Sequence, residues 1–145
     1  MAAGNFVPYE QGILDIANQT VDFVGGTVKA MLLTAAYTPS ASADQHLDDI
    51  VANECADGDY ARQTVGSKTI ALASNKVRFD CADIDFGNAV TITAKYLVLF
   101  LDTGTPSTST LLWYVDLNTG GGSASSTGAD FDIAINASGI YEVTP

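Results

Sequence analysis

From Val65 onward, apolar and polar residues alternate with a period of two, and no other feature of the sequence constrains the fold as strongly. The clearest alternating stretches are 70–72, 77–81, 90–93, 111–117 and 131–135. Successive side chains of a β-strand point to opposite faces, so this alternation predicts half-buried antiparallel strands. Trp113 lies on the apolar side of its stretch, and we therefore expect it in the core.

One stretch, Tyr96–Leu101, is apolar on both faces. It predicts a central strand whose second face is covered by a loop, a neighbouring strand or another subunit. The polar, glycine-rich run 118–128 is expected to be a flexible loop. Shorter turn signals lie at 66–67, 74–75, 87–88, 102–104 and 138–139. About eight short strands separated in this way predict an all-β fold, a single antiparallel β-sandwich of jelly-roll-like type.

The first third of the chain is less regular. Residues 9–17 are expected to form a short helix, with apolar residues at helical spacing at Ile13, Leu14 and Ala17. Residues 28–34 predict a strand, and Asp44 is expected to cap a short helix over 45–50.

The first ten residues allow two interpretations. In one, residues 1–10 form an extended arm that lies on a partner; in the other, they fold back onto their own sandwich. The candidate contacts of the arm are Phe6, Val7, Pro8 and Tyr9. Neither a repeat nor a linker interrupts the sequence, so we expect one domain over 1–145, with the sandwich in 11–145.

The charge balance excludes one class of function. The chain has 17 acidic and 6 basic residues, a formal net charge of −11. A nucleic-acid binder needs a Lys/Arg face to neutralise phosphates, and none is present, so no nucleic-acid partner is expected. Acidity of this kind also serves simply to keep a weakly charged protein soluble.

The sequence also predicts the compartment. Residues 1–5 have neither a basic nor an apolar signal region, and the run 96–101 is far too short to span a bilayer. We therefore expect synthesis in a cytoplasm and no membrane partner. Cys81 is expected to be a small buried hydrophobe, and a disulfide with Cys55 is not expected in reducing cytosol.

The strongest enzymatic motif is Asp102-Thr103-Gly104, which follows an apolar strand as in aspartic proteases. That chemistry requires two carboxylates that share one proton, so a single copy would act only as a symmetric homodimer. No convincing flap accompanies the motif. The simpler interpretation is a polar turn at the end of a strand.

Other site types are weaker. Carboxylates that offer calcium ligands are Asp57, Asp59, Asp80, Asp83 and Asp85, but the EF-hand spacing is absent. His46, the single histidine, has no Ser or Cys partner in a recognisable motif. We therefore predict no enzyme, no cofactor and no metal site.

Several segments recur in an order that is similar to a known family. They are 28–34 (VKAMLLT), 37–39 (YTP), 44–46 (DQH), 57–65 (DGDYARQTV), 93–105 (TAKYLVLFLDTGT), 111–116 (LLWYVD) and 137–140 (ASGI). Together they resemble a family of small virion proteins of tailed bacteriophages, in which the DTG triplet is a strand-end turn. Asp59 departs from the pattern, which has glycine before Tyr60, and Cys55 is not part of it.

The resemblance implies a capsid cement or decoration protein that stabilises the lattice of the major capsid protein from outside. It implies self-association as a dimer or trimer, and assembly onto the outer capsid surface in the cytoplasm of a bacterial host. One alternative is a tail, neck or fibre component, and a distant one is the homodimeric protease through Asp102. A carbohydrate-binding module that stacks sugars on Trp113 and Tyr114 is disfavoured, because Trp113 falls on the inward face.

Overall fold

A computed structural model of the protein describes residues 3–145, and within this range it is an all-β fold with one α-helix, as predicted. The elements of its first half are β1 (Val7–Pro8), α1 (Glu10–Ala17), β2 (Val28–Leu33), the 3-10 turns η1 (Leu47–Asp49) and η2 (Val51–Asn53), β3 (Gln63–Thr64) and β4 (Thr69–Ala73). Those of its second half are β5 (Lys76–Asp80), β6 (Ile84–Asp85), β7 (Val90–Ala94), β8 (Tyr96–Leu101), the 3-10 turn η3 (Pro106–Thr108), β9 (Leu111–Asp116), β10 (Ala124–Ala129), β11 (Asp132–Ile133) and β12 (Tyr141–Val143).

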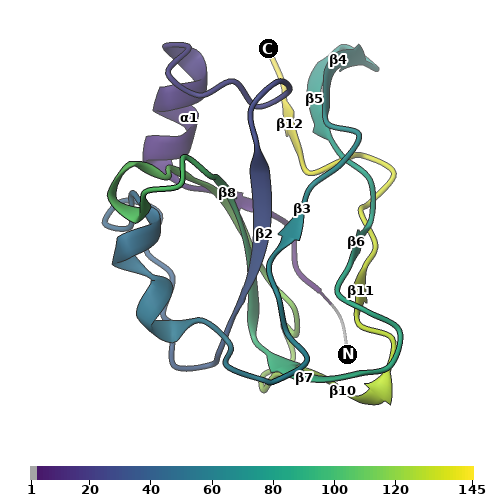
Figure 1. Cartoon of the computed structure of the whole chain (residues 1–145). Helices are drawn as coiled ribbons and strands as arrows, with labels where there is room; N and C mark the ends of the chain where they lie inside the picture. Colours follow the sequence, from purple (N-terminus) through teal and green to yellow (C-terminus); the bar gives the residue numbers. More distant parts are fainter. Residues whose placement is uncertain (1–2) are drawn as a thin grey trace.

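The main sheet has the strand order β1-β9-β8-β2-β3, and all its neighbours are antiparallel. The β2 and β8 strands pair over their full lengths, from Val28 opposite Leu101 to Leu33 opposite Tyr96. Both strands were predicted, and β8 is central, as expected from its two apolar faces. Figure 1 shows β2 and β8 in the middle of the molecule.

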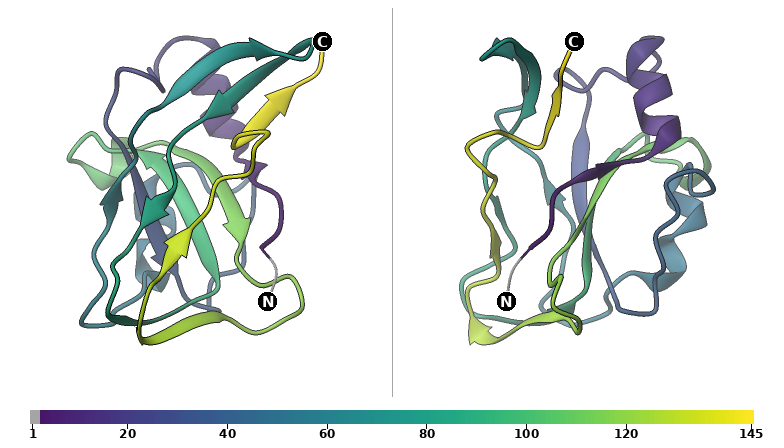
Figure 2. Two further views of the ribbon diagram at one scale, coloured as in Figure 1. Left: turned by 90° about the vertical axis from the view of Figure 1, so that its right-hand side faces the viewer. Right: turned by 180° about the vertical axis from the view of Figure 1, so that it is seen from behind.

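The second layer is a long, interrupted antiparallel ladder between residues 76–94 and 124–143. It consists of three separate pairings, β7 with β10, β6 with β11 and β5 with β12, and β4 extends the last of them. Figure 2 shows this ladder along one side of the molecule. Because these pairings do not form one continuous sheet, the single jelly-roll-like sandwich is not confirmed.

The principal core lies between the main sheet and the ladder. Trp113 is fully buried there, as predicted, and its ring contacts Phe23, Phe79 and Tyr141 at centroid distances of 5.5, 5.3 and 6.2 Å. Its indole Nε1 has no hydrogen-bond partner. An indole enclosed in this way is a packing residue and offers no surface to a sugar.

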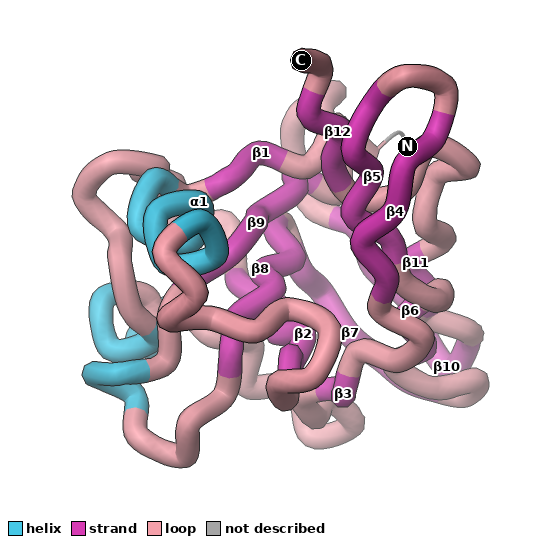
Figure 3. The backbone as a smooth tube through the Cα atoms, turned by 90° about the horizontal axis from the view of Figure 1, so that it is seen from above, coloured by secondary structure: helices cyan, strands magenta, loops and turns pink. Residues whose placement is uncertain are grey.

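The opposite face of the main sheet carries a second core. Met31, Leu33, Val98, Phe100 and Leu111 form its floor. The chain's own segments cover them, through the side chains of Tyr9, Tyr37, Leu47 and Ile50. In Figure 3 the helical segments lie on this side of the sheet. Of the three covers that the sequence allowed for β8, the structure therefore has a loop of the same chain.

The predicted helix is α1. Of its three predicted apolar residues, Ile13 packs against the principal core, but Leu14 and Ala17 are exposed. Gly12 and Asp15 are buried, whereas Leu14 is 55% exposed. A Cβ at Gly12 would collide with the Leu111 carbonyl oxygen, so glycine allows α1 to lie directly on β9. Asp15 accepts hydrogen bonds from Thr110 Oγ1 and Gln11 Nε2, both at 2.8 Å.

Two local predictions are wrong. Asp44 does not cap a helix over 45–50; instead, His46 is the N-cap of the 3-10 turn η1, whose Asp49 side chain accepts the backbone N–H groups of Gln45 and His46. The expected loop 118–128 is only partly a loop, because its second half belongs to β10. Ser126 is buried there and its hydroxyl donates to the Val90 carbonyl at 2.8 Å, which shows how a polar strand satisfies its groups.

Candidate partner-binding surface

The N-terminal segment does not form an exposed arm, and this corrects one of the two interpretations of residues 1–10. Val7 and Pro8 form β1, which pairs with Tyr114 and Trp113 at the edge of the main sheet. Tyr9 is fully buried and Phe6 packs against the principal core. Proline suits this edge, because the outer side of the strand needs no N–H donor. Met1 and Ala2 lie outside the described residues.

A hydrogen-bonded chain fixes Tyr9. The Tyr37 hydroxyl donates to Asp44 Oδ2 at 2.6 Å, and the Tyr9 hydroxyl lies 2.8 Å from that of Tyr37. Because Tyr37 has given its only proton to Asp44, Tyr9 is the donor of the second bond. Burial raises the pKa of both tyrosines, which keeps them neutral. Of the predicted contact residues, only Val7 is well exposed, at 38%.

Beside this segment, a surface groove of about 640 Å³ separates residues 3–6 from the end of the ladder. Its walls combine the apolar residues Phe6, Val115, Ile133, Ile135, Ile140 and Tyr141 with the polar side chains of Asn5, Asn136 and Ser138. Its one carboxylate, Glu142, is held in ion pairs by Arg78 at 3.1 Å and Lys76 at 3.7 Å. The groove therefore presents apolar and neutral polar groups, and its one carboxylate is already held in ion pairs.

A second hollow of about 300 Å³ continues the groove past Ala134 and Ile133 toward Asp130 and Asp132. Asp132 lies opposite Asp85 in the β6–β11 pairing. A hydrogen bond from its protonated form to Asp85 raises the pKa of Asp132, and the neighbouring negative charges act in the same direction. This end of the groove is acidic and the other end is neutral.

The sequence motif of the aspartic proteases is a structural turn. Asp102 forms an ion pair with Lys29 at 2.7 Å and accepts the Gly104 N–H at 2.9 Å. The hydrogen bond from Lys29 and that from Gly104 lower the pKa of the Asp102 carboxyl. A carboxylate stabilised in its charged form is unsuited to sharing a proton with a second aspartate.

The carboxylates considered as calcium ligands bind backbone groups instead. Asp57 and Asp59 accept the N–H groups of Thr93 and Thr91 at 3.0 and 2.8 Å, and so satisfy the edge of β7. Asp80, Asp83 and Asp85 accept those of Cys81, Ile135 and Gly87. Within residues 3–145, the one group of three ligand residues close enough for a metal ion is His46, Asp48 and Asp49, in which Asp49 already caps η1.

The two cysteines are separate, buried thiols. Burial raises the pKa of Cys55 to about 11 and that of Cys81 to about 12. At neutral pH both are protonated and therefore unreactive as nucleophiles. The prediction for Cys81 is confirmed.

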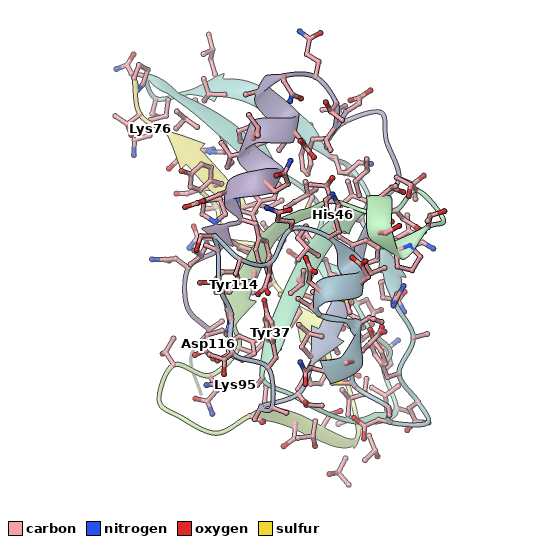
Figure 4. The ribbon with its side chains drawn as sticks, turned by 90° about the vertical axis from the view of Figure 1, so that its left-hand side faces the viewer. Tyr37, His46, Lys76, Lys95, Tyr114 and Asp116 are labelled. Carbon is pink, nitrogen blue, oxygen red and sulfur yellow. The ribbon has the colours of Figure 1, made fainter. Side chains whose placement is uncertain are left out.

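A further ion pair holds the ends of β8 and β9 together at the margin of the main sheet. Lys95 Nζ lies 2.8 Å from Asp116 Oδ1, and it also donates to the Asn118 carbonyl at 2.6 Å. Figure 4 shows Lys95 and Asp116 next to each other, with Tyr37 and Tyr114 above them. These contacts fix the turn after β9 and so the approach of the chain to the groove.

Comparisons with protein-family models, curated proteins and solved structures found no match to this chain. No helix within residues 3–145 is long and apolar enough to cross a membrane. The sequence analysis missed the groove. Its alternation identified Ile133 and Ile135 as apolar, but only the tertiary structure brings them beside residues 3–6.

Proposed function

We propose that the chain is a non-enzymatic structural protein of a tailed-phage particle, a cement or decoration protein bound to the outside of the major capsid protein lattice. The groove between residues 3–6 and 133–142 carries this proposal. Its lining offers contact area to a protein segment, and the one carboxylate of its larger hollow, Glu142, is held in ion pairs.

The segments that resemble the phage family support the same conclusion. Three of them, 28–34, 93–105 and 111–116, supply β2, β8 and β9, the three middle strands of the main sheet. The DTG triplet ends β8 as an ion-paired turn, which agrees with its role in the resemblance. A protein that binds a lattice gains affinity from many repeated weak contacts, so a modest groove is sufficient for each copy.

The copy number of the chain in purified particles tests the proposal. Gel densitometry against the major capsid protein should give a ratio near one-to-one or one-to-a-few. A handful to a few dozen copies per particle would instead indicate a tail, neck or fibre component. Absence from particles would contradict both versions.

The groove itself is tested by filling it. Ala134 is exposed and lines both hollows, so Ala134→Arg should lower the occupancy of purified particles by obstructing the groove. Ala129→Arg, at an exposed position of β10 outside the groove, is the matched control and should leave occupancy unchanged. Equal occupancy of both variants would exclude the groove as the contact. A truncation before Gln11 is unsuitable, because it removes the buried Tyr9.

A further inference from the structure

The hairpin β4–β5 carries apolar side chains that the rest of the chain does not cover. Leu72 is 86% exposed and Ile70 42%, although their alternation predicted half-buried positions. Across the three strands they share one face with Val77, Phe79, Tyr141 and Val143, as the pairing register shows. Phe79 is buried at the inner end of this face, whereas the side chains near the turn extend beyond the core. Figures 1 and 2 show the turn near the C-terminus at one end of the molecule.

The outer edge of β4 is also open. The strand order is β12-β5-β4, so within residues 3–145 no strand pairs with the far side of β4. Ser74 and Asn75 have φ values of 52° and 63°, which is the conformation of a tight two-residue hairpin turn. Ala73 and Lys76, which flank the turn, therefore form a hydrogen-bonded pair, and the pattern alternates along the strand. The backbone groups of Ile70 and Leu72 consequently point outward.

Nothing in β4 protects this edge. Proteins usually block an exposed edge with a charge, a proline or a bulge, and the sequence TIALA has none of these. The three-stranded sheet carries two basic residues, Lys76 and Arg78, and two acidic ones, Asp80 and Glu142, so its net charge is zero. On a chain with net charge −11, this is a place where a second copy approaches without like-charge repulsion.

We propose that β4 is a self-association edge, which pairs antiparallel with β4 of a second copy about a two-fold axis at Ala71. In this register Ile70 of each chain lies opposite Leu72 of its partner, and the outward backbone groups of both residues are satisfied. The two apolar faces also join into one. The contact involves five residues per chain and is smaller than a standard interface of about 800 Å² per partner, so the dimer is weak and concentration-dependent. The proposal concerns the isolated chain and stands apart from the virion role.

Engineered disulfides test the register. Ala71 lies opposite itself in a non-hydrogen-bonded pair, with Cα atoms about 4.5 Å apart, within disulfide range. Mild oxidation of the Ala71→Cys variant should therefore give a covalent dimer on a non-reducing gel. Thr69→Cys is the matched control on the same exposed face; its two copies would lie roughly 14 Å apart across the axis. The native thiols are buried and should contribute no background.

Sedimentation at increasing protein concentration supplies the second measurement. Leu72→Lys should abolish the rise in mass, and Leu14→Lys, at the exposed leucine of α1, should leave it unchanged. Circular dichroism checks that both variants are folded. Preferential crosslinking at position 71 together with loss of association in Leu72→Lys supports the proposal. Equal crosslinking at 69 and 71, no crosslinking at 71, or a wild type that stays monomeric would overturn it.

Discussion

Two apolar sheet faces of this protein differ in whether other segments of the chain cover them. On the main sheet, the face formed by Met31, Phe100 and their neighbours is covered by the chain's own residues 37–50 and by Tyr9, and the side chains at its centre are fully buried. On the three-stranded sheet, the face that ends in Leu72 is left in solvent near the turn. Both faces carry alternating apolar residues in the sequence. The difference shows that burial depends on which segment lies above a face, and an alternating pattern does not encode that.

The largest expected effect is on the covered face. Phe100→Ala removes a fully buried ring and should lower the free energy of unfolding by about 3–5 kcal/mol, measured by urea denaturation. The loss includes the packing of Arg62, whose guanidinium carbon lies 5.4 Å from the ring centroid. A loss below about 1 kcal/mol, which is typical of surface positions, would mean that residues 37–50 do not cover the sheet in solution.

The next largest effect on stability is expected in residues 37–50 and Tyr9, which form the cover of this face. Tyr37→Phe keeps the ring but removes the hydroxyl that links Tyr9 to Asp44. It leaves the buried Tyr9 hydroxyl without its acceptor, while Asp44 keeps the Ser40 N–H as a donor. We expect a loss of about 1–3 kcal/mol in the free energy of unfolding, measured in the same way. Tyr141→Phe is the control, because this tyrosine is only partly buried. Equal effects of the two substitutions would show that the buried chain of hydroxyls does not hold the cover.

The sequence predicted the parts of this fold that local pattern determines. β2, β8 and β9 follow from their apolar runs, and the turn at Ser74–Asn75 from its residue types. It failed where distant segments decide the outcome. The apolar residues Phe6 to Tyr9 would suit an exposed arm as well as an edge strand, and only the pairing with β9 distinguishes the two. The strand β10 is polar, so it has no apolar alternation from which to predict it. Its pairing with β7 and the Ser126 hydroxyl satisfy hydrogen-bonding groups there.

A smaller effect is expected at the margin of the covered face, where Lys29 and Asp102 meet. Asp102→Asn should cost about 0.2–1 kcal/mol at pH 7, since the pair is partly exposed. The pKa of Asp102 is lowered in the folded state. Its contribution to the free energy of unfolding is therefore present above the unfolded-state pKa of about 4 and is lost as the pH falls through the folded-state pKa. Thermal melting at pH 7 and at acid pH should show the difference between variant and wild type disappear in acid.

The smallest effect is expected on the uncovered face. Leu72→Ala should change the free energy of unfolding of a dilute sample by less than about 0.5 kcal/mol, because the side chain is 86% exposed. At high concentration the wild type should gain stability that the variant lacks, since a partner that binds only the folded chain stabilises it by mass action. Urea denaturation at two protein concentrations distinguishes stabilisation by association from an effect within the single chain. A large loss in dilute solution would mean that the hairpin folds onto its own body, and the contrast between the two faces would then be wrong.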